Sequence, residues 1–237
     1  MKGFVFDLDN TLFDRYATLT AIITENYETI RPYLNPAHTA ASAAEHLCRT
    51  EALYLPLKQN WNNLYDVLVQ EYFFHPNNTP AARQAIDFLG ACYRKTAINF
   101  PFIRELLAEM KAKGYKLGII TNGGHSLQQA KLDLLNISEY FDAIVISGDF
   151  AEKMGDGQND MRWYKPAPSI FRYAAEQLGE QPQDLYYVGD NPINDVGGAQ
   201  AAGFVPVWVR SRGLWILDAN EMPEHVVNDI SELRNYL

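Results

Sequence analysis

Cysteine, positive charge and long apolar runs are all scarce in this sequence. The two cysteines, Cys48 and Cys92, stand in helix-like stretches without the Cys-x-x-Cys spacing of a zinc site, so we expect buried free thiols in a reducing compartment. No uncharged apolar run reaches the ~18 residues that a membrane-spanning helix needs, and no basic and apolar signal segment precedes the first strand. These absences predict a soluble, cytoplasmic protein without a membrane partner.

The charge balance limits the class of ligand. The 29 acidic residues outnumber the 20 basic ones, which gives a formal net charge of −9. Proteins bind duplex nucleic acid largely by neutralising its phosphates, so we expect no nucleic-acid polymer as a partner. A small phosphorylated metabolite remains compatible, because a divalent cation and a few positioned donors offset its charge locally. For the assembly we expect a monomer or a homodimer.

Apolar strands alternate with helical patterns from about residue 97 onward. This alternation predicts an α/β fold with a Rossmann-like, doubly wound parallel sheet and helices on both faces. The expected strands cover about residues 4–6, 115–120, 141–147, 184–188 and 204–209. The polar stretch 148–163 is expected to be a surface loop, and residues 230–237 a short closing helix.

Residues 15–97 interrupt this pattern and contain helical periodicity only. Four helices are expected, over about residues 15–31, 36–52, 61–72 and 80–95. We therefore predict two domains, an α/β core of residues 1–14 and 98–237 and a helical insertion of residues 15–97. Six aromatic residues of the insertion are expected to form mainly its core, with one or two as candidates for a pocket wall: Tyr54, Trp61, Tyr65, Tyr72, Phe73 and Phe74.

Two carboxylates, Asp7 and Asp9, follow the first strand directly. In open α/β sheets, ligands bind at the carboxyl ends of the strands. Two neighbouring acids stay ionised together where a hard cation neutralises them, so this pair is a candidate metal site. Taken alone, the Asp-x-Asp pattern is equally compatible with a solvated turn.

Three further polar segments stand at the same edge of the predicted sheet. Thr121 and Asn122 end the second strand, and the two glycines that follow let backbone N–H groups turn toward an anion. Lys165 stands just before a helix, where its ammonium can reach an anion held at the sheet edge. Asp190 and Asp195 follow the fourth strand at a spacing that lets both acids face one cation.

These segments resemble the motifs of a known family. Asp7-Leu8-Asp9-Asn10-Thr11 resembles the first motif of the haloacid dehalogenase (HAD) superfamily, and the segments at Thr121, Lys165 and Asp190 resemble its second, third and fourth motifs in order. The resemblance covers essentially the whole chain. It implies that residues 15–97 are a C1-type helical cap, a lid that closes over the acids and selects the substrate. Most members of the superfamily are magnesium-dependent phosphatases.

Carried over residue by residue, the resemblance implies a role for each acid. Asp7 is expected to be the nucleophile that forms an aspartyl-phosphate, and Asp9 the general acid and base. Mg²⁺ is expected on the Asp7 carboxylate, the Asp9 backbone carbonyl and Asp190. Asp195 is expected as a further or outer-shell metal ligand.

The remaining motif residues are expected to bind phosphate. The resemblance implies that Thr121, Asn122 and Lys165 hold the transferring phosphoryl oxygens, so that Thr121 and Lys165 also take part in catalysis. His125 follows the glycines and is either a further phosphate contact or a solvated turn residue.

The expected reaction is magnesium-dependent hydrolysis of a phosphomonoester. Similarity around residues 118–123, 126–129, 140–142 and 145–147 to bacterial pyrimidine 5'-nucleotidases makes a nucleoside 5'-monophosphate the first expected substrate. Phosphoglycolate-phosphatase-like proteins share much of this pattern, so a phosphoglycolate or sugar-phosphate phosphatase is the alternative, followed by a phosphomutase. Dehalogenation is disfavoured because the haloacid dehalogenases lack an acid at the position of Asp9. A non-catalytic binding or scaffold protein is the non-enzyme alternative.

Overall fold

The computed structural model describes residues 1–54, 61–75, 79–154, 161–210 and 216–237. By its internal contacts the chain divides into two compact units, one of residues 1–14 with 99–237 and one of residues 15–98. The first unit carries a β-sheet, and the described part of the second consists of helices and their connections.

One sheet of six parallel strands forms the centre of the first unit. The strands are β1 Gly3–Phe6, β2 Lys116–Thr121, β3 Ala143–Ile146, β4 Leu185–Gly189, β5 Val205–Val209 and β6 His225–Val227. Their order is β3-β2-β1-β4-β5-β6, the order of the Rossmann fold, so the predicted doubly wound sheet is confirmed. β1 lies between β2 and β4, and the residues that follow these three strands therefore meet at one edge.

Helices connect these strands. The α-helices are α6 Ile103–Ala112, α7 His125–Leu135, α8 Ser147–Lys153, α9 Pro168–Leu178 and α10 Gly198–Ala202, and η5 Pro192–Gly197 is a π-helix. The short 3-10 segments are η2 Ser138–Tyr140, η3 Met161–Trp163, η4 Pro182–Asp184, η6 Ala219–Glu221 and η7 Ile230–Tyr236.

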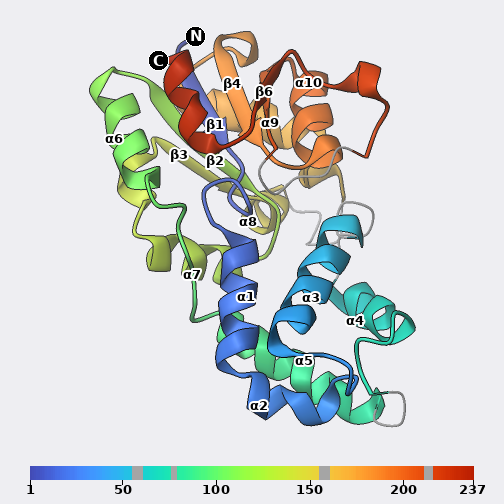
Figure 1. Cartoon of the computed structure of the whole chain (residues 1–237). Helices are drawn as coiled ribbons and strands as arrows, with labels where there is room; N and C mark the ends of the chain where they lie inside the picture. The colour runs from blue at the N-terminus through green and yellow to red at the C-terminus, as the bar shows by residue number, and fades with distance from the viewer. Residues whose placement is uncertain (55–60, 76–78, 155–160, 211–215) are drawn as a thin grey trace. The chain divides into compact units, whose positions relative to one another are not determined.

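Both faces of the sheet are covered, which explains why β1 is apolar throughout. All four of its residues are buried. Val5 and Tyr187 belong to the core beneath α9 and α10. On the opposite face, the ring of Tyr186 packs against Phe4 at 5.1 Å and against Tyr236 of η7 at 5.4 Å, measured between centroids. Figure 1 shows α6 and the C-terminal segment on this second face.

The prediction of a surface loop over residues 148–163 is wrong at both ends of that stretch. Residues 147–153 form α8, and residues 161–163 form η3. Phe150 is buried, with its ring 4.6 Å from that of Tyr173 and 5.4 Å from that of Trp163. A helix of seven residues is too short for a periodic pattern to reveal it. Residues 155–160 lie outside the described residues.

The sequence also failed to predict β6. This strand has three residues and lies at the edge of the sheet, where it pairs only with β5 among the described strands. Three residues show no alternation that separates a strand from a turn, so pairing with β5 decides the conformation.

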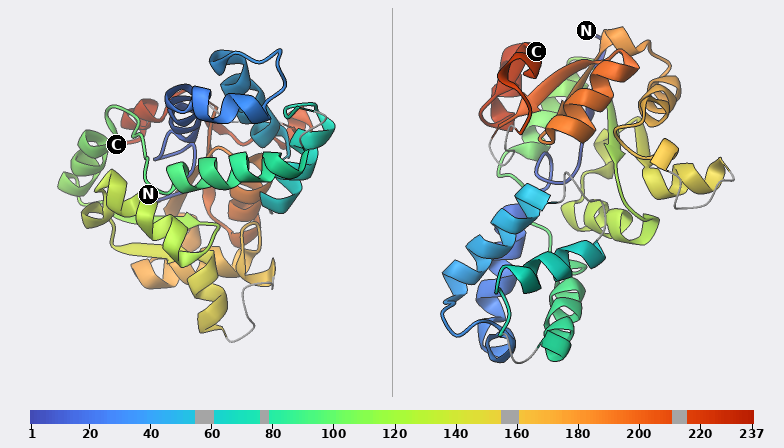
Figure 2. Two further views of the ribbon diagram at one scale, coloured as in Figure 1. Left: turned by 90° about the horizontal axis from the view of Figure 1, so that it is seen from below. Right: turned by 90° about the vertical axis from the view of Figure 1, so that its right-hand side faces the viewer.

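The second unit consists of packed helices. Its elements are α1 Arg15–Glu25, α2 Tyr27–Ile30, η1 Arg31–Tyr33, α3 Ala40–Tyr54, α4 Trp61–Gln70 and α5 Thr79–Tyr93. α1 packs against both α3 and α5 (Figure 2). The single helix expected over residues 15–31 is interrupted at Asn26, whose Nδ2 donates a hydrogen bond to the Ile22 carbonyl at 2.8 Å.

The aromatic residues of this unit differ in exposure. Phe73 and Phe74 are buried, with ring centroids 5.0 Å apart in an edge arrangement, as expected for core residues. Tyr72 is 67% exposed, so the core prediction is wrong for this residue. The side chains of Tyr54, Trp61 and Tyr65 lie outside the described residues.

Two other sequence expectations concern thiols and membranes. Cys48 is buried and Cys92 half-buried, and neither forms a disulfide. Within the described ranges, no helix combines the length and the apolar character needed to cross a bilayer.

Candidate active site

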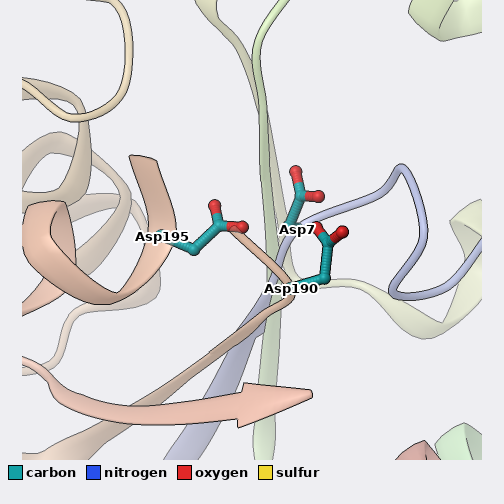
Figure 3. Close-up of side chains that lie close together, drawn as sticks. All are labelled: Asp7, Asp190 and Asp195. Carbon is teal, nitrogen blue, oxygen red and sulfur yellow. The ribbon is translucent and has the colours of Figure 1, made fainter. Parts of the chain in front are cut away.

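Three acids meet at the carboxyl edge of the sheet (Figure 3). Asp7 directly follows β1, Asp190 directly follows β4, and Asp195 lies on η5. One carboxylate oxygen from each lies within 4.8 Å of the others. The backbone N–H of Asp7 donates to the Val188 carbonyl at 2.9 Å, which ties the ends of β1 and β4 together. Adjacent parallel strands thus gather acids that are far apart in the sequence.

Lys165 connects two of these acids. Its Nζ lies 2.5 Å from Oδ1 of Asp7 and 2.7 Å from Oδ1 of Asp195, and its side chain is 2% exposed. The third contact, at 3.1 Å, is with the hydroxyl of Tyr187. Burial by itself lowers the pKa of Lys165, but Asp195 and Asp7 raise this pKa well above its ordinary value. The ammonium therefore stays charged in the interior of the unit.

Asp9 pairs with a different lysine. Nζ of Lys131, on α7, lies 2.7 Å from Oδ1 and 2.8 Å from Oδ2 of Asp9. Nε2 of Gln128, one turn earlier on the same helix, lies 3.5 Å from Oδ2 of Asp9. The carboxylate of Asp9 is thus held by side chains of the helix that follows β2.

Burial and mutual repulsion make two of the acids hard to ionise. Burial raises the pKa of Asp7 to about 7, with Lys165 opposing this shift and Asp195 adding to it. Burial likewise raises the pKa of Asp190 well above its ordinary value, and the charges of Asp195 and Asp7 raise it further. A bound cation would remove this penalty, because opposite charge favours the ionised carboxylates.

The donor set fits a divalent, oxygen-seeking cation. With all four acids of the site ionised, four negative charges face the two positive charges of Lys131 and Lys165, which leaves a net charge of −2. Carboxylate oxygens are the ligands that Mg²⁺ prefers. The cluster of Asp7, Asp190 and Asp195 could therefore hold Mg²⁺.

Asp195 is the most constrained of the three acids. Its Oδ1 accepts hydrogen bonds from Lys165 and, at 3.2 Å, from the hydroxyl of Tyr187. Its Oδ2 accepts from the backbone N–H of Asn191 at 2.9 Å. A Cβ atom at Gly189 would lie 2.5 Å from this carboxyl group, so only glycine fits beneath it. With both oxygens in use, Asp195 fits the outer-shell position better than direct ligation.

The loop that carries Asp190 is held from two sides. Nε1 of Trp208, on β5, donates to the Asp190 carbonyl at 2.8 Å. Oδ1 of Asn191 accepts from the backbone N–H groups of Ile193 at 3.0 Å and Asn194 at 2.9 Å and so caps η5. Asp190 is therefore presented by a rigid turn.

The residues after β2 divide into two kinds. The hydroxyl of Thr121 is buried and has no hydrogen-bond partner among the described residues. It can therefore donate a hydrogen bond to an oxygen of a bound ligand. The amide of Asn122 is already engaged. Its Nδ2 donates to the Lys165 carbonyl and its Oδ1 accepts from the Lys165 N–H, both at 2.9 Å. These contacts favour a positioning role for Asn122 over the predicted phosphate contact.

α8 and α7 hold the glycine turn that follows Asn122. Oγ of Ser147 accepts from the Gly123 N–H at 2.9 Å. Gly123 has φ +145°, and a Cβ atom there would lie 2.7 Å from Nε2 of Gln128. His125 is exposed, and its pKa is raised by a hydrogen bond of 2.9 Å to Asp149. This pairing fits the solvated turn position.

Sequence reasoning missed Tyr187, Lys131, Gln128 and Trp208. Tyr187 and Trp208 were visible only as apolar strand residues. A signal did exist for the other two, because Gln128 and Lys131 are three residues apart on the helix after Thr121 and therefore share one face. Lys131 and Gln128 are both 2% exposed, which is unusual for such polar side chains.

Comparisons with known proteins agree with this geometry. Residues 1–203 match the family model described as hydrolase, haloacid dehalogenase-like hydrolase. The chain is 35% identical over 246 residues to the N-acylneuraminate-9-phosphatase of Mus musculus, with 98% of this chain and 92% of that protein covered. It is 31% identical over 257 residues to the glyceraldehyde 3-phosphate phosphatase of Methanothermobacter thermautotrophicus, with 100% of both covered.

A solved structure shares the fold. The putative HAD-hydrolase of Bacillus subtilis, solved with bound magnesium, has a TM-score of 0.69 to this chain at 17% identity, over 100% of this chain and 98% of that one. The matched model spans the α/β unit through Gly203 together with the helical insertion. The chain therefore belongs to the haloacid dehalogenase-like hydrolases, and within them it is a phosphatase, a phosphoric monoester hydrolase.

Proposed function

We propose that the protein hydrolyses a small phosphorylated sugar or sugar acid with the help of Mg²⁺, through an aspartyl-phosphate on Asp7. The observation that carries this proposal is the gathering of Asp7, Asp190 and Asp195 within 4.8 Å, with the buried ammonium of Lys165 against two of them. Phosphoryl transfer depends on placing negative oxygens among fixed positive groups, and this edge of the sheet holds three acids that could bind a metal ion together with the ammonium of Lys165.

Asp7 and Asp9 divide the chemistry in this proposal. The carboxylate of Asp7 attacks phosphorus, and the bond from phosphorus to the leaving oxygen breaks. Asp9 gives its proton to the leaving oxygen and then accepts a proton from the water that hydrolyses the acyl phosphate. Two groups donate hydrogen bonds to the phosphoryl oxygens. They are the ammonium of Lys165 and the hydroxyl of Thr121, which has no partner among the described residues.

The oxygen atoms present at the site determine which residues would bind the metal ion. Asp7, Asp190 and the backbone carbonyl of Asp9 would hold Mg²⁺, with Asp195 in the outer shell. When bound, the ion offsets the repulsion between Asp7 and the phosphate dianion.

The relatives favour the alternative substrate class over the first expected one. By their names, the mouse and archaeal relatives act on N-acylneuraminate 9-phosphate and on glyceraldehyde 3-phosphate, both small phosphorylated compounds of the sugar class. Neither of these two relatives is named a nucleotidase. Alignment over the whole chain carries more weight than the similarity of short segments to pyrimidine 5'-nucleotidases. We therefore place sugar phosphates before nucleoside monophosphates.

Phosphate release from a panel of esters tests the proposal. The panel contains N-acetylneuraminate 9-phosphate, glyceraldehyde 3-phosphate, hexose phosphates, phosphoglycolate and pyrimidine and purine monophosphates, each with Mg²⁺ and with excess chelator. We expect release that requires Mg²⁺ and is fastest with a sugar phosphate. A clear preference for nucleotides would overturn the substrate class, and release that persists in chelator would overturn the metal dependence. NMR of the phosphate-containing products detects a phosphomutase, which would isomerise a sugar phosphate without release.

A further inference from the structure

Lys131 is a second buried lysine at the site, and the mechanism proposed above gives it no role. Its side chain is 3% exposed, and its Nζ donates to both oxygens of Asp9, at 2.7 and 2.8 Å. A lysine is rarely buried to this extent unless a specific partner compensates its charge. Lys165 pairs instead with Asp7 and Asp195, so the two lysines serve different acids.

The position of Lys131 is fixed relative to the end of β2. Gln128 donates from Nε2 to the Asn122 carbonyl at 2.5 Å, which anchors the first turn of α7 to the turn after the strand. Because residues three apart lie on the same helix face, Gln128 and Lys131 approach Asp9 together.

Lys131 also contacts the far end of the turn that carries Asp9. Its Nζ lies 5.3 Å from the centroid of the Phe13 ring, within the range of a cation–π contact. Hydrogen bonds from the Asn10 N–H to the Phe13 carbonyl, 2.7 Å, and from the Phe13 N–H to the Leu8 carbonyl, 2.9 Å, close this turn. One ammonium therefore holds both the carboxylate and the turn that presents it.

We propose that Lys131 is a positioning residue for Asp9, which sets the direction in which Asp9 exchanges protons with the substrate. This inference rests on the proposed function, in which Asp9 is the acid and base. Proton transfer needs a donor within hydrogen-bond reach of its acceptor, and a carboxylate gripped through both oxygens loses rotation about its Cβ–Cγ bond. In the step concerned, the bond from phosphorus to the leaving oxygen breaks as the Asp9 proton moves onto that oxygen, and a neutral alcohol leaves.

The dependence of rate on the leaving group tests this role. An alkoxide needs a proton to leave, whereas p-nitrophenolate leaves readily without one. In Lys131→Met we expect kcat/KM on the best sugar phosphate, which reports the steps up to departure of the leaving group, to fall about 10- to 100-fold, part of what a general acid contributes. On p-nitrophenyl phosphate we expect a loss in kcat/KM of less than about threefold, because its leaving group depends little on proton donation.

Three further variants distinguish loss of the contact between Lys131 and Asp9 from a general effect of removing a lysine. Lys131→Arg retains a donor fork that grips both oxygens of a carboxylate, so we expect it to recover much of the lost rate. Asp9→Asn with Lys131→Met should lose no more than Asp9→Asn alone, because residues that act as a unit are not additive. Lys111→Met is the matched control, because Lys111 also grips both oxygens of an acid, Asp142, at 2.8 Å each, before the start of β3. Its kcat/KM should match that of the wild type on both substrates.

The outcomes separate the two proposals. Equal losses in kcat/KM on the two substrates, or no loss on either, would overturn the role of Lys131 and leave the phosphatase assignment intact. A wild-type protein that releases phosphate from neither substrate would overturn the proposed function and this inference with it. If Lys131→Met fails to fold, as judged by circular dichroism, the same comparison of the two substrates is made with Lys131→Gln, which removes the charge and keeps a polar side chain.

Discussion

The side-chain amide of Asn122 brackets the backbone of Lys165, donating to its carbonyl and accepting from its N–H, both at 2.9 Å. The two residues come from different parts of the unit, one from the end of β2 and one from the segment before α9. This contact sets the point from which the Lys165 side chain reaches Asp7 and Asp195. Asn122, which was itself expected to touch phosphate, thus holds the backbone of the lysine to which we assign that contact.

Asn122→Ala should therefore impair catalysis through Lys165. Two hydrogen bonds to a part-buried backbone are lost, so we expect the free energy of unfolding to fall by about 1–3 kcal/mol. Misplacement of the ammonium should lower kcat about 10- to 100-fold. Steady-state kinetics and urea unfolding measure the two effects. Asn35→Ala is the control, since Asn35 also bridges backbone groups, Tyr72 and Ala37, but in the helical unit. Equal kcat values for the two variants would contradict the positioning role.

Tyr187→Phe should slow the reaction without disturbing the core. The hydroxyl of Tyr187 lies 3.1 Å from Nζ of Lys165 and 3.2 Å from Oδ1 of Asp195, while its ring packs on Phe171 at 4.9 Å between centroids. Phenylalanine keeps the ring contact but removes the hydroxyl that contacts the buried ammonium of Lys165. We therefore expect kcat to fall about 5- to 50-fold. Tyr186→Phe, one residue earlier and on the other face of the sheet, should leave kcat unchanged. The prediction fails if both variants behave alike.

Asp7→Asn should abolish phosphate release while the fold is retained. The amide has nearly the shape of the carboxylate but is no nucleophile at phosphorus, so we expect a loss of at least about 10³-fold in kcat. A phosphate-release assay with a detection limit below this level, together with circular dichroism, measures both parts. Asp149→Asn, which removes an exposed acid, is the control. Turnover near the wild-type rate in Asp7→Asn would show that another residue is the nucleophile.

Magnesium should stabilise the protein more at high pH than at low pH. Burial raises the pKa of Asp7 from 3.8 to about 7 and that of Asp190 well above its ordinary value, so protons compete with the metal for these oxygens. We expect the rise in Tm on adding Mg²⁺ to be clearly larger at pH 8 than at pH 5.5, and to vanish in Asp190→Asn.

The metal-free protein should respond in the opposite direction. A raised carboxyl pKa means that the folded state binds more protons than the unfolded state between pH 3.8 and about 7. The contribution of Asp7 to the free energy of unfolding therefore falls as pH rises through this window. Chemical denaturation in chelator at several pH values measures the slope. A shift in Tm with Mg²⁺ that is independent of pH would contradict both predictions.

The sequence predicted the parts of the fold whose signal is long and local. Apolar runs of four to six residues followed by acids or glycines identified β1, β2 and β4, and their alternation with helices indicated a parallel sheet. β6 and α8 escaped prediction because three and seven residues hold too little periodicity. The conformation of β6 depends on pairing with β5, and that of α8 depends on the burial of Phe150.

By itself the sequence determined which residues are ionisable and in which order they follow the strands. That order was enough to expect Asp7, Asp190, Asp195 and Lys165 at one edge, because parallel strands end on the same side of a sheet. Only the tertiary structure decided the partners of each. Hydrogen bonds and ion pairs act over about 3 Å, so Lys131 on Asp9, Tyr187 on Lys165 and Asn122 on the Lys165 backbone follow from packing between distant segments. A local sequence pattern does not encode contacts between residues this far apart along the chain.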